Sequence, residues 1–318
     1  MNAVAASSLE NIERKGWLSR LKTEGPCPAT LALSLIVLLS LGLHLYNLDA
    51  IGDANVYYTA AVKSMLQSWH NFFFVAAEPG ASVTVDKPPL GLWMQALSAM
   101  VFGVSGVSVV LPNILAGVLS VPLVYHLVKK YFGTSAGLVA ALALALTPIS
   151  VAVDRNNTVD GMLIFTLLLA AWAFLSATET GKLRTLLLGG LRVGLGFNIK
   201  MMQAFLPLPA LYALYFLGAK TGWGRKLLHL GLTSVVLVVV ALSWAVAVDL
   251  TPADQRPYVG SSTNNSVLEL IFDHNGIDRL LGRNSGQSSR PTASQCDAAA
   301  PFPGRSAASS DSTADFQV

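Results

Sequence analysis

The stretch TVDKPPL, residues 84–90, places an acid, a lysine and two prolines directly before an apolar helical run. A Lys or Asp at the middle of a bilayer costs roughly 3 kcal/mol, so charged residues beside apolar helices normally face a polar cavity or the water boundary. Pro88 and Pro89 suit the first turn of the following helix, where a missing amide proton costs nothing. The prolines therefore fix the position of Lys87 beside Asp86.

The composition places this helix in a membrane protein. Hydrophobic residues make up 53% of the 318-residue chain and charged residues 12%, and the mean hydropathy is +0.54. These values are too apolar for an ordinary soluble domain of this length. The net charge of +3 is small and spread over short loops, which argues against nucleic-acid binding. Cys27 and Cys296 lie far apart without metal-ligand spacing, so neither a disulfide framework nor a zinc site is indicated.

Apolar runs near the length of a membrane span, which takes about 17 to 25 residues, lie at 29–47, 108–128, 135–153, 160–177, 184–199, 202–218 and 227–248. The run 184–199 is short, and its Arg192 must snorkel or face a polar interior. An eighth apolar run, residues 90–104, is also short.

Lys and Arg favour the cytoplasmic side of a membrane. Their clusters all fall on one side only if the run 90–104 does not cross; they lie before the first span, at Lys129–Lys130, at Lys182 and Arg184, and at Lys220, Arg225 and Lys226. We therefore predict an all-α polytopic membrane protein with seven spans in residues 29–249. Residues 1–28 are expected in the cytoplasm, and an outer loop, 48–107, is expected to carry surface helices and the non-spanning helix 90–104.

This topology gathers the candidate site residues on the outer side of the membrane: Asp53, Asp86, Lys87, Asp160 and Lys200. Each has a simpler explanation. Lys87 could be an interfacial lysine that only pairs with Asp86, Lys200 an ordinary interfacial residue, and Asp160 an acid that favours a helix N-terminus by about 0.3 to 1 kcal/mol. Their coincidence on one face favours a functional site, and a fixed ammonium suits an anionic lipid headgroup or a phosphate.

The motifs resemble a known family in order and spacing over about residues 30–283. They are DKPPL at 86–90, Leu111-Pro112, KKYFG at 129–133, Ala136-Gly137, Thr147-Pro148 and NNTVD at 156–160. This pattern is similar to the family 39 group of bacterial membrane glycosyltransferases, which contains aminoarabinose transferases acting on lipid A and protein O-mannosyltransferases. The resemblance implies a GT-C-type transmembrane helix bundle with a large first outer loop and an active site on the outer face of the bacterial cytoplasmic membrane.

The resemblance also implies transfer of a sugar from a polyprenyl-phosphate donor to a lipid, glycan or protein acceptor. Such transfer needs a carboxylate base for the acceptor hydroxyl and cations to neutralise the departing lipid phosphate. By this similarity Lys87 binds the donor phosphate and Lys200 assists it. Asp86 and Asp160 shape the sugar or acceptor pocket, and either could hold a divalent cation; no other cofactor is indicated.

The general base is less well defined by the resemblance. Many relatives carry Asp-Glu-x-Tyr-Tyr at the start of the first loop, and aligning Tyr57 and Tyr58 with it puts Ala54 and Asn55 where the acids stand. Asn55 and Tyr57 are then expected in the substrate site, and Asp53 is one residue out of register. Three alternatives stay open: a one-residue shift lets Asp53 serve, the chain uses another base, or the protein is inactive.

The end of the chain departs from the family pattern. Residues 250–283 are expected to form an outer loop, and residues 284–318 are rich in Ser, Ala, Gly and Pro, a composition that does not bury a core. We expect a disordered tail there, produced by truncation or a frameshift near Arg283. An inactive fragment of such an enzyme is therefore one alternative function. A secondary transporter is a second, although it should show inverted repeats and midplane polar residues.

Overall fold

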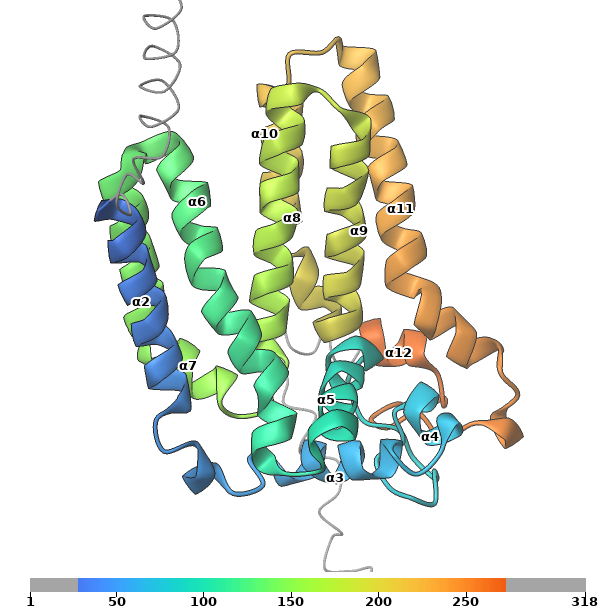
Figure 1. Ribbon diagram of the computed structural model, residues 1–318. Helices are drawn as coiled ribbons and strands as arrows, with labels where there is room; N and C mark the ends of the chain where they lie inside the picture. Colours follow the sequence, from blue (N-terminus) through green and yellow to red (C-terminus); the bar gives the residue numbers. More distant parts are fainter. Residues whose placement is uncertain (1–27, 273–318) are drawn as a thin grey trace, which may run out of the picture.

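The computed structural model describes residues 28–272, and helices form most of this part of the chain (Figure 1). The predictions for the N-terminal segment, for residues 273–283 and for the low-complexity tail concern residues outside it. The elements are α2 (Pro28–Leu45), η1 (Leu48–Ile51), α3 (Val56–Met65), α4 (Trp69–Phe74), α5 (Pro89–Phe102), α6 (Gly106–Leu146), α7 (Pro148–Asp154), α8 (Asp160–Thr180), α9 (Leu183–Lys200), η2 (Met201–Phe205), α10 (Leu208–Gly218), α11 (Trp223–Leu250), η3 (Ala253–Gln255) and α12 (Val267–Phe272).

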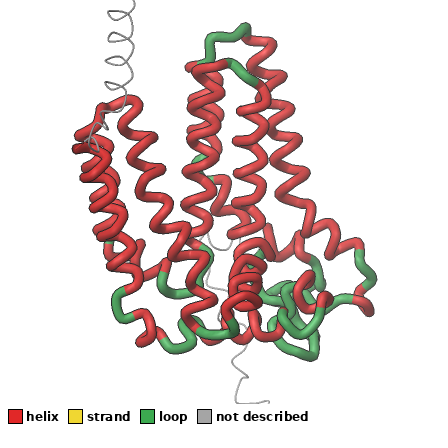
Figure 2. Tube along the Cα trace, in the orientation of Figure 1, coloured by secondary structure: helices red, strands yellow, loops and turns green. Residues whose placement is uncertain are grey.

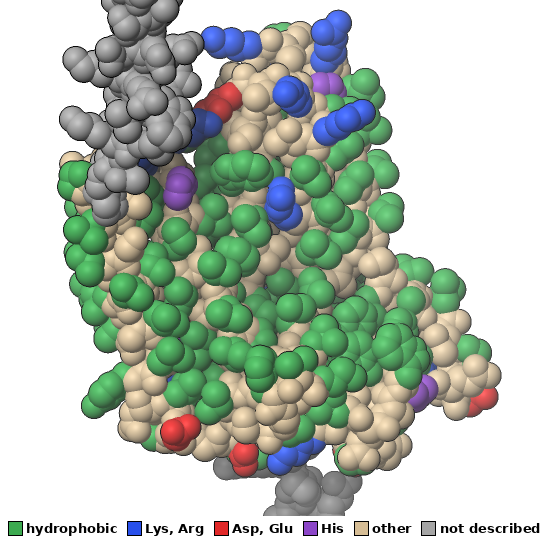
Figure 3. All heavy atoms as spheres, in the orientation of Figure 1, with side chains coloured by type: hydrophobic (Ala, Val, Ile, Leu, Met, Phe, Trp, Pro, Cys, Tyr) green, Lys and Arg blue, Asp and Glu red, His purple; other side chains and the backbone are tan. Residues whose placement is uncertain are grey.

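The long helices pack in a row, and the short ones gather at one end of it. α2 packs on α6, α6 on α8, α8 on α9 and α9 on α11. α3, α4, α5 and α12 lie together at the lower end in Figure 1, and Figure 2 shows that most loops lie there too. On the face shown in Figure 3, hydrophobic side chains form a broad band, and Lys and Arg side chains gather at the upper end. This distribution fits an all-α membrane protein, as predicted.

Gly133 divides α6 into two parts. Its backbone, at φ 86° and ψ 172°, is outside the helical region, and only glycine adopts such a conformation readily. Beyond Gly133 the chain folds back on itself. The close approach of the two parts is seen at Gly137, where a methyl group would meet the Tyr125 carbonyl oxygen at 2.9 Å. The predicted runs 108–128 and 135–153 thus lie in different halves of α6. The second run also ends earlier than predicted, because Pro148 starts the separate helix α7 and holds Thr147 in an extended conformation.

Within residues 28–272, four helices could cross a membrane by length and composition: α2, α6, α8 and α11. A fifth candidate is the bent pair formed by residues 183–205 and α10, whose parts meet at 91°. With 11 residues, α10 is about 16 Å long, against a hydrocarbon core of roughly 30 Å. The seven-span count therefore stays a prediction. α5, with 14 residues, is also short for a span, in agreement with the predicted non-spanning helix.

Aromatic side chains attach the lower layer to the bundle. The Trp93 ring of α5 stacks on Phe72 of α4 at 5.6 Å between centroids, and its Nε1 donates to the Phe72 carbonyl oxygen at 2.7 Å. From α11, Trp244 Nε1 donates to the carbonyl oxygen of Phe73 at 3.0 Å. A tryptophan can bury its ring only if its N–H finds an acceptor. These bonds hold α4 against α5 and against the end of α11.

Candidate active site

Asp86 and Lys87 lie at the start of α5 and form an ion pair. Lys87 Nζ donates to Asp86 Oδ2 at 2.6 Å, and Lys87 is only 7% exposed. Pro88 is extended at φ −69° and ψ 161°, and Pro89 occupies the first turn, as predicted. Because the prolines restrict the backbone on one side and burial restricts the side chain, the ammonium has one fixed position.

The C-terminal part of the described chain supports the loop that carries this pair. Thr84 N donates to the Tyr258 carbonyl oxygen at 2.8 Å, and Gly260 N donates to Thr84 Oγ1 at 3.0 Å. On the other side, Val85 N donates to the Val75 carbonyl oxygen at 2.9 Å. The segment after α11, expected only as an outer loop, thus holds the backbone two residues before Asp86.

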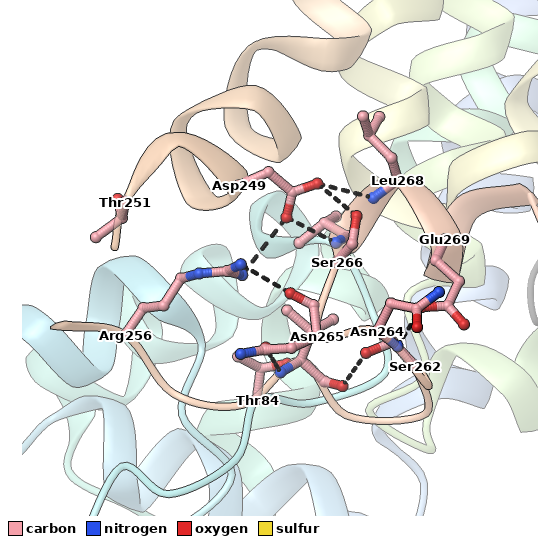
Figure 4. Close-up of polar contacts among 12 residues, drawn as sticks. Thr84, Asp249, Thr251, Arg256, Ser262, Asn264, Asn265, Ser266, Leu268 and Glu269 are labelled. Atoms are coloured by element: carbon pink, nitrogen blue, oxygen red, sulfur yellow. Dashed lines mark hydrogen bonds and ion pairs between the residues drawn. The ribbon is translucent and has the colours of Figure 1, made fainter. Parts of the chain in front are cut away.

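Asp249, in the last turn of α11, organises that segment (Figure 4). Its carboxylate accepts from Val267 N at 2.8 Å and from Leu268 N at 3.2 Å, the first amides of α12. It also forms an ion pair with Arg256 at 3.5 Å. Arg256 Nη2 in turn donates to the Asn265 carbonyl oxygen at 2.7 Å. A carboxylate accepting from free amides at a helix N-terminus caps the helix.

Asp249→Ala is expected to loosen the segment between α11 and α12. The change removes the cap of α12 and the partner of Arg256, and loss of a cap costs about 1 kcal/mol. Chymotryptic cleavage after the exposed Tyr258, in the same segment, should become faster in the folded protein. Asp49→Ala, which changes an exposed acid in η1 at the same end, serves as the control. Equal cleavage rates in the two variants would contradict the proposed support.

Asp160 and Lys200 form a second ion pair. Asp160 is the first residue of α8 and Lys200 the last of α9, and Lys200 Nζ donates to Asp160 Oδ1. An acid at a helix N-terminus and a base at a helix C-terminus are each favoured by the helix dipole. Both side chains are largely buried, which strengthens their attraction.

Gly91 brings the two ion pairs to one region. It lies in the first turn of α5, and a methyl group on it would overlap the side chain of Val159 and touch that of Ile199 at 3.6 Å. Val159 precedes Asp160, and Ile199 precedes Lys200. The first turn of α5, four residues after Lys87, therefore packs directly on the two helix ends that carry the second pair. The prediction that these four charges share one face agrees with this packing.

Tyr57 lies beside the first pair, and Asn55 has a structural role. The Tyr57 hydroxyl approaches the backbone of Asp86; burial of the ring and the Asp86 charge raise the pKa of Tyr57 above its usual value. Asn55 caps α3, since its Oδ1 accepts from the amides of Tyr57 at 3.1 Å and Tyr58 at 3.4 Å. The structure thus shows Asn55 orienting the helix that carries Tyr57.

Asp53 stands apart from both ion pairs. It is exposed in the turn before α3, where its backbone carbonyl accepts from Thr59 Oγ1 at 2.7 Å. Its carboxylate makes no ion pair within residues 28–272. Asp53 is therefore close in sequence to Tyr57 but is not held in place by a lysine.

The motif DRNNTVD, residues 154–160, connects much of the structure. Asn157 Oδ1 accepts from Asn55 N at 2.9 Å, and Asn157 Nδ2 donates to Thr59 Oγ1 at 3.0 Å. The Asn157 carbonyl oxygen accepts from Gln95 Nε2 of α5 at 2.8 Å. A fully buried Asn thus connects α3 and α5 to the residues just before Asp160. Its sequence neighbours gave no sign of this role.

Asn157→Ala should destabilise the fold strongly for a single substitution. It leaves the half-buried backbone amide of Asn55 without its acceptor and removes the buried bond to Thr59, and an unsatisfied buried polar group costs roughly 1 to 3 kcal/mol. Chemical unfolding in detergent micelles measures this loss. Asn156→Ala is the matched control, because the adjacent Asn156 is exposed and should change stability little. Equal stabilities of the two variants would contradict the role assigned to Asn157.

A buried histidine–aspartate pair lies next to Asp160. His44 Nε2 is 3.2 Å from Asp154 Oδ2, and His44 Nδ1 bonds the Ser40 carbonyl oxygen at 2.7 Å. A methyl group on Gly117 or Gly161 would overlap the Asp154 carboxylate, so glycines make room for it. A cavity of about 190 Å³ is lined by His44, Asp154 and Asp160. No local pattern indicates this pair, because its members are 110 residues apart and His44 stands in an apolar run.

A metal site is not formed by side chains alone in the described part of the chain: no three His, Cys, Asp or Glu residues come together there. Asp86 and Asp160 are each paired with a lysine. The expectation that either holds a divalent cation stays a prediction.

Comparison with known proteins gives one consistent family. The family described as "Dolichyl-phosphate-mannose-protein mannosyltransferase" matches residues 86–244, half of the chain. Two Bacillus subtilis (strain 168) proteins, "Putative mannosyltransferase YycA" and "Putative mannosyltransferase YkcB", are 50% and 49% identical to the chain. Each alignment covers 80% of this chain, and 37% and 36% of the respective relative.

A more distant relative is the "Undecaprenyl phosphate-alpha-4-amino-4-deoxy-L-arabinose arabinosyl transferase" of Pseudomonas paraeruginosa. It is 31% identical over 65% of this chain and 36% of its own length. The chain thus spans little more than a third of the curated relatives it matches. No solved structure matches it significantly. The match begins at Asp86 and includes both ion pairs, and the chain belongs to the dolichyl-phosphate-mannose-protein mannosyltransferase family of membrane glycosyltransferases.

Proposed function

We propose that this chain takes part in moving a sugar from a polyprenyl-phosphate donor to a lipid, glycan or protein acceptor at the outer face of the bacterial cytoplasmic membrane. The observation that carries the proposal is the buried, rigidly placed Lys87 ammonium, which pairs with Asp86 beside a second ammonium–carboxylate pair. The named donor of the Pseudomonas relative, an undecaprenyl-phosphate sugar, supports the class of donor.

Lys87 is suited to a leaving phosphate. When the bond from sugar to phosphate breaks, negative charge grows on the phosphate, and a preorganised cation stabilises that charge most effectively where water is excluded. Lys200 is a second cation for the same group, held by Asp160 at the neighbouring helix ends. A carboxylate must also accept the proton of the acceptor hydroxyl. Asp53 and Asp160 are the candidates, and Tyr57 lies beside the proposed phosphate site.

An apolar groove starts next to Lys87 and can take the lipid part of the donor. Its volume is about 540 Å³, and it runs between α5, α6 and α8, with Leu90, Met94, Leu115, Met162 and Phe165 among its lining residues. Leu90 is three residues from Lys87. A prenyl chain in this groove would place its phosphate near the ammonium.

The charge distribution supports a site on the outer face. The Lys and Arg clusters lie just before the Gly133 break in α6, between α8 and α9, and between α10 and the first turn of α11. In Figure 1 these parts of the chain are at the upper end. The two ion pairs lie at the opposite end. Because Lys and Arg in short loops favour the cytoplasm, the site is expected to face outward.

Reconstitution of the purified chain in proteoliposomes tests the proposal. Radiolabelled polyprenyl-phosphate mannose and polyprenyl-phosphate aminoarabinose are supplied with bacterial lipid and protein acceptors, and labelled product is measured. Binding of undecaprenyl phosphate is measured in parallel, so that donor recognition is read separately from turnover. Donor-dependent product supports the enzyme. Uptake of intact solute without transfer would instead favour a transporter, and donor binding without product would favour an inactive form.

A further inference from the structure

A third pocket lies at the end of the bundle opposite the candidate active site. It has a volume of about 390 Å³ and lies between α6 and α8. Figure 1 shows these two helices apart at this end, and in Figure 3 Lys, Arg and His side chains gather above the hydrophobic band. The polar and apolar residues that form it are His126, Lys129 and Lys130 of α6 and Trp172, Leu175 and Ser176 of α8.

The pocket carries excess positive charge. Lys130 pairs with Glu179, which also accepts from the Tyr131 hydroxyl at 2.7 Å. Lys129 has no acidic partner among residues 28–272, and its Nζ lies 5.2 Å from the centroid of the Tyr125 ring. One acid thus faces two lysines, and the Lys129 ammonium is available to an anion.

A third cation lies behind the pocket wall. The Arg192 guanidinium of α9 stacks 5.8 Å from the Trp172 ring centroid. Its Nη1 is buried and has no hydrogen-bond partner in the described part of the chain. A charged group among apolar helices is costly unless an opposite charge or water compensates it. An anion in the pocket would lower that cost, because the Trp172 ring that lines the pocket lies against the Arg192 guanidinium.

We propose that this pocket binds the anionic headgroup of a membrane phospholipid. Basic pockets between spans at a membrane boundary suit lipid phosphates, since each Lys or Arg attracts anionic lipid. Lys129 contacts the phosphate, and the acyl chains lie along Trp172 and Leu175. A free anion would use the lysines but gain nothing from the apolar side chains, whereas a lipid uses both. The inference does not depend on the proposed transfer reaction.

Lipid titration of the purified full chain tests the site. Thermal unfolding in a neutral detergent is followed by tryptophan fluorescence while phosphatidylglycerol, phosphatidylcholine or inorganic phosphate is added. Phosphatidylglycerol should raise the Tm, because a ligand that binds only the folded state stabilises it. Lys129→Ala should weaken the binding of phosphatidylglycerol about fivefold, which corresponds to the contribution of one basic residue near anionic lipid. Lys129→Arg should retain binding, and Glu179→Gln, which removes the acid that pairs with Lys130, should tighten it.

Lys182→Ala is the matched control, because Lys182 is an exposed lysine at the same end that does not line the pocket. Equal losses in the Lys129 and Lys182 variants would show general attraction to lipid and overturn the proposal. Equal stabilisation by phosphatidylcholine or by inorganic phosphate would overturn it too. A change of oligomeric state in Lys129→Ala, with unchanged lipid affinity, would assign the pocket to a second copy of the chain.

Discussion

Lys87→Ala is expected to weaken binding of undecaprenyl phosphate by roughly 10- to 100-fold, the usual cost of losing a hydrogen bond to a charged group. The effect has two parts. The phosphate loses a preorganised ammonium, and Asp86 is left without its lysine and repels the ligand. Direct binding to the purified chain measures the affinity, and the proteoliposome assay should show a loss of transfer at least as large.

Three further variants sharpen this prediction. Lys63→Ala removes an exposed lysine of α3 in the same lower layer and should leave binding unchanged. The double variant Asp86→Asn/Lys87→Ala should recover part of the affinity, because the repulsion is removed together with the attraction. Lys87→Arg keeps the positive charge but replaces the compact ammonium with a planar guanidinium, so an affinity between those of the wild type and Lys87→Ala is expected. Wild-type affinity in Lys87→Ala would contradict the proposal that the donor phosphate binds at Lys87.

The sequence predicted the parts of the fold that depend on local chemistry. Pro88 and Pro89 mark the start of α5, and the apolar run that follows forms a helix of only 14 residues. That this helix does not cross the membrane stays a prediction. Lys129, Lys130 and Gly133 mark the turn between the runs 108–128 and 135–153, whereas the break at Pro148 within the second run was not predicted. The bend of 91° before α10 was not expected, since hydropathy reports the length of an apolar run but not the angle at Pro207.

For the candidate site, the charged residues were predicted and their supports were not. Asp86, Lys87, Asp160 and Lys200 are conspicuous because charges are rare in so apolar a chain, and the structure brings them to one region. The contacts of Asn157 with Asn55 and Thr59 depend on packing between distant segments. No local pattern encodes such a contact.

Asn55 illustrates how a register argument fails to identify a role. Its position opposite an acid of the relatives placed it in the substrate site, but its side chain is occupied in capping α3. Asn is among the best N-cap residues, so the sequence context Asn55-Val56-Tyr57 was compatible with a cap from the start. The cap orients Tyr57, through which Asn55 still affects the neighbourhood of Asp86.

Asp160→Asn is expected to lower kcat of transfer by about 100-fold or more, the usual contribution of a general base, with little change in donor affinity. Asp160 accepts from Lys200 in the ion pair, so its carboxylate is already engaged by a donor. A donor phosphate that draws Lys200 to itself would free the carboxylate to accept the proton of the acceptor hydroxyl. Phosphate binding and proton removal would then be coupled through one lysine.

Asp53→Asn distinguishes this coupled arrangement from a base that is free throughout. Asp53 has no lysine partner in the described part of the chain. If Asp53 is the base, Asp53→Asn should therefore lower kcat by the same factor with and without Lys200. If Asp160 is the base, Lys200→Met should lower donor affinity, and Asp160→Asn should still lower kcat in the Lys200→Met background, because the proton acceptor is needed whether or not the lysine is present. Asp254→Asn, a change at an exposed acid in η3, controls for the loss of one negative charge at this end. A large loss of kcat in Asp53→Asn with near wild-type turnover in Asp160→Asn would assign the base to the first loop and leave Asp160 to hold Lys200.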